Sequence, residues 1–289
     1  MNRNRSAAIS AARDPLQAAF TLRAQGNPRE ALETLSIPGE FSIDSYILRG
    51  DLQFELGQIE QAVETYLAVT EDDPDHVYAQ GQLGLCLYRL KLWEAAAHAF
   101  EMVLQFDPHR DEVRLQLADC CLHLLRFEAA LTCFDECWSE GSRRRALFGK
   151  AVALQLLRRL DEAEKLYERL LTIDPAAEEA LSNLIAMSME AFELARVQNY
   201  SQRLLEINSH STVALQGLAL AAIERLDYAA AARYFHRALE LDPEIMHPPA
   251  EPSEAVEYRI SRKIFDSLEE TRRKLKFKTA RVSSGAQPR

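Results

Sequence analysis

Cysteine and histidine side chains are the groups in this sequence whose spacing could support metal chemistry. Cys133 and Cys137 are four residues apart, so a helix would place both thiols on one side, with His123 nearby in the sequence. Thiolate and imidazole ligands with such spacing are typical of zinc sites. The same cysteines fall at positions where small side chains pack, and a buried free cysteine behaves as a small hydrophobic residue. We therefore expect the five cysteines to be structural thiols without a bound metal.

Motifs of enzyme active sites are missing from the sequence. It contains no glycine-rich phosphate loop, no His-Glu-x-x-His pair and no Gly-x-Ser-x-Gly elbow. The remaining histidines are scattered along the chain, and acidic runs such as EDDPD at residues 71–75 have the composition of solvated turns. We therefore expect a non-catalytic protein that uses no cofactor.

The composition indicates a globular chain with enough apolar material for a continuous core. The 289 residues are 47% hydrophobic and 27% charged, with a net charge of -10. No apolar run approaches the roughly 20 residues that cross a bilayer. The basic start, MNRNR, is followed by an apolar stretch that is too short for a signal peptide. We therefore expect a cytoplasmic protein whose thiols stay reduced.

A pattern of small, large and terminating residues recurs along most of the chain. Steps of 31, 34, 34, 33, 34 and 34 residues separate the small residues Ala31, Ala62, Ala96, Ala130, Ala163, Val197 and Ala231. Four residues later, most copies have a large side chain: Leu35, Tyr66, Phe100, Phe134, Tyr167 and Phe235. Proline terminates four copies at Pro74, Pro108, Pro175 and Pro243, and serine replaces it at Ser142 and Ser209.

This pattern resembles the tetratricopeptide repeat, a helix-turn-helix unit of about 34 residues. The resemblance covers residues 12–245 as about seven copies. It implies an all-α fold, a right-handed superhelical solenoid in which the small residue lets two helices approach and the large one fills the adjoining space. One helix pair cannot bury both of its faces, so the pairs stack. The sixth copy is atypical, with Val197 and Ser201 at the small and large positions.

The two ends of the chain differ in composition from the repeats. We expect residues 1–11 and 279–289 to be disordered, and residues 246–252 to form a proline-rich linker. Residues 253–278 would form a capping helix with one apolar face, which carries Val256, Ile260, Ile264, Leu268 and Leu275. From residue 258 onward there are ten Lys and Arg against three Asp and Glu. The alternative is therefore a regulatory or targeting protein whose basic C-terminal helix binds membrane or nucleic acid.

The resemblance also implies that the first helix of each copy lines a concave groove in which a partner binds. Aligning the copies predicts the groove residues Phe54, Tyr78, Gln82, Leu85, Tyr88, Gln116, Asp119, Phe148, Val152, Asn183, Gln216 and Leu220. Most of these side chains are apolar or amides, which favours an apolar or amphipathic partner segment. We expect Gly81, Gly149 and Gly217 to leave gaps that the side chains of the partner could enter.

One known function of such repeats can be tested against the residues. Repeat domains that bind the acidic tails of heat-shock chaperones use a clamp of Lys, Asn and Arg side chains. At the Asn position of the clamp, the copies have Phe20, Asp51, Leu85, Asp119, Val152, Ala186 and Leu220. We therefore expect a protein-interaction adaptor, scaffold or chaperone whose partner is a protein or peptide other than an acidic chaperone tail. Nucleic acid and membrane are the disfavoured partners, and the oligomeric state stays open.

Overall fold

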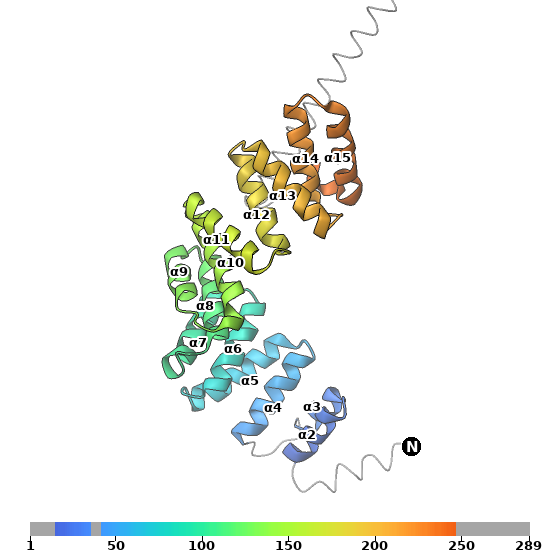
Figure 1. Ribbon diagram of the computed structural model, residues 1–289. Coiled ribbons are helices and arrows are strands. Elements are labelled where there is room, and N and C mark those ends of the chain that lie inside the picture. Colours follow the sequence, from blue (N-terminus) through green and yellow to red (C-terminus); the bar gives the residue numbers. More distant parts are fainter. Residues whose placement is uncertain (1–14, 36–41, 247–289) are drawn as a thin grey trace, which may run out of the picture. The chain divides into compact units, whose positions relative to one another are not determined.

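The computed structural model describes residues 15–35 and 42–246, and every regular element within these ranges is a helix (Figure 1). The chain divides into two compact units, Met1–Arg158 and Arg159–Arg289. The expected disordered ends, the capping helix at 253–278 and all of the linker except Met246 lie outside the described residues.

Unit 1 contains nine described helices, in which successive helices pack against each other along the chain (Figure 1). They are α2 (Pro15–Ala24), α3 (Pro28–Thr34), α4 (Ile43–Glu55), α5 (Ile59–Asp72), α6 (Val77–Arg89), α7 (Trp93–Phe106), α8 (Asp111–His123), α9 (Phe127–Asp135) and α10 (Glu140–Leu156). We call α4, α6, α8 and α10 the first helices of their repeats, because each precedes the helix that carries the small residue.

Unit 2 repeats the same arrangement, with α12 and α14 as first helices. Its described elements are α11 (Leu160–Ile173), α12 (Glu178–Glu190), α13 (Leu194–Ile207), α14 (Thr212–Glu224), α15 (Tyr228–Leu241) and the 3-10 helix η1 (Pro243–Met246). In each unit a helix packs against its neighbours in sequence, which is the arrangement of a repeat solenoid. The all-helical repeat fold expected from the sequence is thus confirmed.

The small residues that define the repeat register are fully buried. All seven, from Ala31 to Ala231, are 0% exposed, and the six large residues that follow them are at most 4% exposed. The large rings pack against the backbone of the preceding helix. A Cβ on Gly50 would lie 2.7 Å from the Tyr66 ring, and one on Gly84 would lie 2.6 Å from Phe100. The register read from the sequence is therefore correct.

The sixth repeat distributes its side-chain volume differently. Ser201 stands where the other copies have a large side chain, and it is fully buried. Larger side chains at two other positions fill the space instead. Val197 on α13 stands where the other copies have alanine, and Ile185 on α12 stands where α6 has Gly84. Helix α14 approaches this site closely, because a Cβ on Gly217 would lie 2.4 Å from the Ser201 Oγ. The atypical residues of this copy thus compensate for one another.

The expected terminator Ser142 lies inside a helix, so this part of the sequence interpretation was wrong. Helix α9 ends at Asp135 after nine residues, whereas α7 has 14, and α10 begins at Glu140. Ser139 caps α10 by accepting a hydrogen bond from the Ser142 backbone N–H, at 3.3 Å. A serine does not stop a helix as proline does, and here a serine three residues earlier starts the next one.

The turn after each first helix uses a left-handed backbone conformation, mostly without glycine. Gly57 has a φ of 75°, whereas the same turn in later repeats has Lys91, Leu125, Arg158, Phe192 and Leu226 at φ between 57° and 62°. At Leu125 the turn is closed by a hydrogen bond from the Arg126 N–H to the Cys121 carbonyl, at 2.8 Å. Bulky residues at positive φ are strained, so these turns reduce stability.

Candidate functional site

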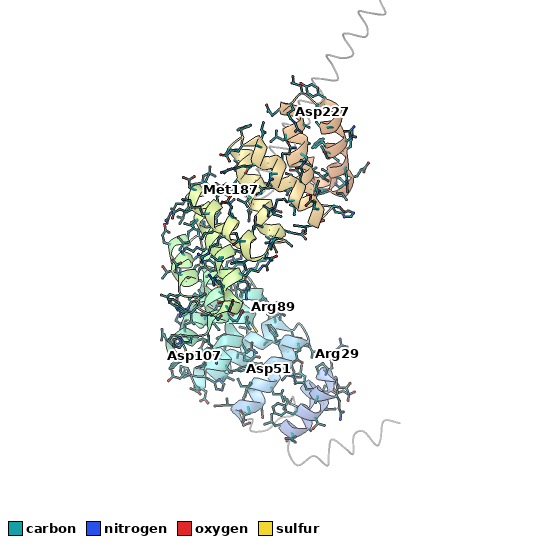
Figure 2. The ribbon with its side chains drawn as sticks, viewed as in Figure 1. Arg29, Asp51, Arg89, Asp107, Met187 and Asp227 are labelled. Carbon is teal, nitrogen blue, oxygen red and sulfur yellow. The ribbon has the colours of Figure 1, made fainter. Side chains whose placement is uncertain are left out.

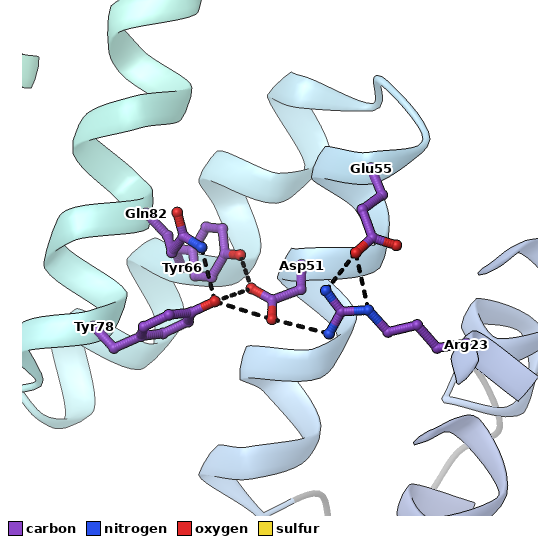
Figure 3. Close-up of polar contacts among 6 residues, drawn as sticks. All are labelled: Arg23, Asp51, Glu55, Tyr66, Tyr78 and Gln82. Atoms are coloured by element: carbon purple, nitrogen blue, oxygen red, sulfur yellow. Dashed lines mark hydrogen bonds and ion pairs between the residues drawn. The ribbon is translucent and has the colours of Figure 1, made fainter. Parts of the chain in front are cut away.

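A largely buried carboxylate, that of Asp51, connects the first three repeats of unit 1 (Figure 3). Asp51 on α4 accepts hydrogen bonds from the Tyr66 hydroxyl at 2.6 Å and from the Tyr78 hydroxyl at 2.9 Å. Arg23 on α2 adds a third donor, with its Nη1 at 3.4 Å from Asp51 Oδ2. The Asp51 side chain is only 11% exposed. One carboxylate therefore links α2, α4, α5 and α6.

The groups around Asp51 are themselves fixed by further hydrogen bonds. Gln82 Nε2 donates to the Tyr78 hydroxyl oxygen at 2.7 Å, and Arg23 Nε donates to Glu55 Oε1 at 2.9 Å. Burial raises the pKa of Tyr66 and of Tyr78, and the hydrogen bonds to Asp51 act in the same direction. Both phenols therefore keep their protons at neutral pH and remain donors to the carboxylate.

The hydrogen bonds of this network orient its side chains. The Asp51 carboxylate accepts bonds from two phenols and a guanidinium, and these bonds fix its position. The Tyr78 side chain, by contrast, is 44% exposed, and its hydroxyl is held in place from both sides. An aromatic ring fixed in this way is suited to contacting another chain.

Two aromatic contacts follow in the next repeats of unit 1, and the first involves Arg89, which Figure 2 labels. The guanidinium of Arg89 on α6 lies over the ring of Phe54 on α4, with its Cζ 4.0 Å from the ring centroid. On the next repeat, the His123 ring stacks on Trp93 with centroids 4.0 Å apart, and Tyr88 meets Trp93 edge-on at 5.0 Å. These rings come from α6, α7 and α8, so they join the third repeat to the fourth.

A second acidic side chain lies beside the aromatic cluster. Burial raises the pKa of Asp119 on α8, although the nearby Arg145 and His123 act against that rise. Tyr88 also has a raised pKa, first through burial and then through the charge of Asp119. The predicted residues Phe54, Tyr78, Gln82, Leu85, Tyr88, Gln116, Asp119, Phe148 and Val152 all lie on first helices of unit 1, and each is at least partly exposed. We call this set, with Asp51, the first-helix face of unit 1.

A comparison with known families identifies the fold. Residues 47–111, which include most of α4 and all of α5 to α7, match the family model of the tetratricopeptide repeat. The chain has the fold of a tetratricopeptide-repeat solenoid. A second model, that of the coatomer epsilon subunit, matches residues 84–214. No curated protein matches the chain.

Solved structures of other repeat proteins resemble this one in fold. The C-terminal part of a tetratricopeptide-repeat protein from Cytophaga hutchinsonii is 15% identical, with a TM-score of 0.64 over 84% of this chain and 98% of that one. PilF from Pseudomonas aeruginosa is 17% identical, with a TM-score of 0.58 over 75% of this chain and 96% of that one. PilW, a type IV pilus biogenesis factor, is also 17% identical, with a TM-score of 0.58 over 71% and 96%.

The three remaining predicted residues belong to unit 2. Asn183 on α12 is half-buried, whereas Gln216 and Leu220 on α14 are 0% and 2% exposed. The latter two side chains are therefore closed to a partner in this structure. Aligning the copies cannot reveal this difference, because the exposure of a side chain depends on the surroundings of its helix as well as on its position in the repeat.

Two of the three glycines expected to leave gaps do not leave them. A Cβ on Gly149 would lie 2.2 Å from the Phe134 ring, and one on Gly217 would lie 2.4 Å from Ser201 Oγ. Both glycines therefore face neighbouring helices inside their own unit. At Gly81 the nearest atom to an added Cβ would be a Val103 methyl carbon at 3.8 Å, which is ordinary contact. The alignment placed these glycines on one face but could not show which atoms lie opposite.

Several residues of the site were missed by the sequence interpretation. Arg23 was not predicted as a site residue, because it contacts Asp51 from a different repeat, 28 residues away in the sequence. Trp93 begins α7, and His123 ends α8, so neither lies at an aligned position of the groove. The sequence did indicate the polar network at one position, because the acidic Asp51 aligns with the apolar Leu85 of the next repeat.

The cysteines lie in or near the core of unit 1. Cys86, Cys120 and Cys121 are buried, Cys133 and Cys137 are half-buried, and all five are free thiols. Burial raises the pKa of Cys86 to about 11 and that of Cys120 to about 12, so these thiols stay protonated at neutral pH. Within residues 15–35 and 42–246, no group of three or more His, Cys, Asp and Glu side chains could hold a metal ion. Among the same residues, no helix is both long and apolar enough to cross a membrane.

Proposed function

We propose that this tetratricopeptide-repeat protein is a non-catalytic adaptor that binds a segment of a partner protein on the first-helix face of unit 1. The observation that carries the proposal is the fixed and exposed ring of Tyr78, which is held between Asp51 and Gln82. Side chains that are ordered before binding lose little conformational entropy when a partner arrives. Aromatic side chains of this kind commonly supply most of the binding energy at an interface.

The chemistry of the face selects the partner segment. Phe54, Leu85 and Tyr88 offer partly exposed apolar surface, and Gln82 and Gln116 offer amides that can pair with backbone groups of an extended chain. An acidic tail would meet the carboxylates of Asp51 and Asp119, so the partner is an extended or amphipathic segment with apolar or aromatic anchors. The five free thiols of the chain fit a reducing compartment, which is our reason for proposing the cytoplasm.

The test uses peptides selected for binding to the full-length chain from a displayed random library. Their affinities are then measured by fluorescence anisotropy against the wild type and against Tyr78→Ala, Tyr88→Ala and Phe148→Ala. Each substitution removes one ring from the first-helix face, and we expect a five- to hundred-fold loss of affinity, about 1–3 kcal/mol. The selected peptides should be enriched in Leu, Ile, Met and aromatic residues.

The control is Tyr234→Ala on α15 of unit 2, which removes a half-buried ring outside the face. This variant should bind the selected peptides with the wild-type affinity. Equal affinities for the wild type and all three face variants would overturn the proposal, as would a selection of peptides dominated by Asp and Glu.

A further inference from the structure

Asp51 and Asp119 occupy the same position in two repeats of unit 1 but have different surroundings. Each lies 11 residues before the small residue of its own repeat, which is Ala62 or Ala130. The Asp51 carboxylate accepts hydrogen bonds from three side chains (Figure 3). The Asp119 carboxylate makes no hydrogen bond and no ion pair within the described part of the chain. Its oxygens therefore remain available as acceptors.

The three residues that donate to Asp51 are replaced around Asp119 by residues that do not donate to it. Counting from the small residue of each repeat gives Tyr88 in the place of Arg23, Phe134 in the place of Tyr66, and Arg145 in the place of Tyr78. Phe134 has no hydroxyl group. Tyr88 lies close enough to be influenced by the charge of Asp119, but it donates no hydrogen bond to that carboxylate. The site at Asp119 thus lacks the donors that the site at Asp51 has.

Arg145 is the one charged replacement, and its guanidinium is held at another carboxylate. Its Nη1 forms an ion pair with Oε2 of Glu112. Glu112 precedes Asp119 by seven residues on α8, which is a distance of about 10 Å along a helix axis. The positive charge of Arg145 therefore influences Asp119 without an ion pair between them. Glu112 keeps this arginine away from the carboxylate.

Guanidinium groups of the chain itself occupy the corresponding positions in the earlier repeats. Arg23 Nη1 lies 3.4 Å from Asp51 Oδ2, so a guanidinium fits beside a carboxylate at this repeat position. Arg89 lies over the ring of Phe54, which has the same repeat position as Tyr88. Both the carboxylate position and the ring position of this face are therefore suited to an arginine side chain.

We propose that Asp119 binds a positively charged side chain, arginine or lysine, of the partner segment, and that this side chain lies against the ring of Tyr88. The inference rests on the proposed function of unit 1 and adds one basic residue to the apolar anchors of the partner. Arginine suits the site best, because a planar guanidinium can donate to a carboxylate and stack on an adjoining ring at the same time.

The first measurement is urea denaturation of the full-length chain without a partner. Asp119→Asn removes a carboxylate that has no described donor, so the midpoint of unfolding should stay the same or rise. Asp51→Asn is the matched variant at the same repeat position. It should lower the midpoint, because three donors lose a charged acceptor. An equal fall of the midpoint in both variants would overturn the proposal, since Asp119 would then be bound within the chain.

The second measurement uses peptides selected from the displayed random library. Peptides selected on the wild type should carry arginine or lysine at one position among their apolar anchors, and selection on Asp119→Asn should lose this preference. Citrulline has the shape of arginine without its charge, and norleucine serves in the same way for lysine. This replacement in a selected peptide should weaken binding to the wild type about ten-fold, and should leave binding to Asp119→Asn unchanged.

Glu101→Gln is the control variant for the loss of one negative charge. Glu101 is exposed on α7, outside the first-helix face, so the neutral peptide should bind this variant as weakly as it binds the wild type. Equal effects of the replacement on the wild type and on Asp119→Asn would overturn the inference, as would selected peptides without basic residues. Neither result would affect the proposed function, which is decided by Tyr78→Ala and Phe148→Ala. A library that yields no binding peptide would overturn both proposals.

Discussion

The Phe100 ring lies so close to Gly84 that a Cβ atom at Gly84 would be 2.6 Å from the nearest ring carbon. Phe100 is fully buried and comes from α7, so the ring has no room to withdraw. The Gly84→Ala substitution should therefore lower the free energy of unfolding by about 1–3 kcal/mol, as overpacking does. Urea denaturation followed by circular dichroism would measure the change.

Gly81 provides the control on the same helix. An added Cβ there would meet only a Val103 methyl carbon at 3.8 Å, and alanine is the better helix former by about 1 kcal/mol. Gly81→Ala should therefore be neutral or stabilising. Similar effects of the two substitutions would show that the contact between Phe100 and α6 is looser than described.

The buried hydroxyl of Ser201 should reduce the stability of unit 2. Ser201 is 0% exposed, and its Oγ has no hydrogen-bond partner among the described residues. The Ser201→Ala substitution removes this unpaired group at little cost in volume, so it should raise the free energy of unfolding by about 1 kcal/mol. Thermal unfolding by calorimetry is the measurement. The comparison is Thr65→Ala, which should destabilise, because Thr65 donates a 2.7 Å hydrogen bond to the buried Gln53 Oε1.

Asp111 should make the stability of unit 1 depend on pH. Its carboxylate accepts bonds from the N–H groups of Trp138 and Ser139 and from the Ser142 hydroxyl, at 3.0, 2.6 and 2.8 Å. Burial is the largest single influence and raises the pKa of Asp111, but the three donors together outweigh it and hold the pKa below its usual value of 3.8. The ionised form is therefore favoured in the folded state. Its stabilising contribution is full above pH 3.8 and is lost as the pH falls through the lower pKa of the folded state.

The Asp111→Ala substitution tests this contribution. It leaves the N–H groups of Trp138 and Ser139, just before α10, without their acceptor and removes one acceptor of the buried Ser142 hydroxyl, so we expect a loss of about 2–3 kcal/mol at pH 7. The loss should shrink as the pH is lowered below 3.8. The adjacent Glu112 is exposed, and Glu112→Ala should change the stability by less than about 1 kcal/mol. A loss at Asp111 that is the same at pH 3 and pH 7 would contradict the assigned role of the charge.

The left-handed turns offer a way to stabilise the protein. Leu125 has a φ of 57° and is 73% exposed, so its side chain gains little from packing while its backbone is strained. Leu125→Gly should raise the free energy of unfolding of unit 1 by about 1 kcal/mol. The reverse change in an equivalent turn, Gly57→Ala, should lower it by a similar amount, because Gly57 has a φ of 75° and no neighbouring atom within 4 Å of an added Cβ. Chemical denaturation of both variants would check the opposite signs.

Sequence patterns predicted the architecture because the small and the large residue of each repeat are buried in the same way in every copy. Ala96 and Phe100 could be placed in the core from their spacing alone, and both are fully buried. The start of α10 could not be predicted, because it depends on Asp111, which lies 28 residues before its cap Ser139. The polar site around Asp51 was missed for a similar reason, since its donors come from three other helices.

The altered packing of the sixth repeat restricts how the repeats could recombine. In the sixth repeat the first helix has the large side chain, Ile185, and the second helix has the small one, Ser201. In the third repeat the first helix has Gly84 and the second has the large Phe100. Exchange of α13 for α7 alone would bring a phenylalanine ring against an isoleucine side chain, and the reverse exchange would leave a void beside a glycine. Gene duplication can therefore transfer whole helix pairs between positions, whereas a crossover within a pair produces a protein with a defective core.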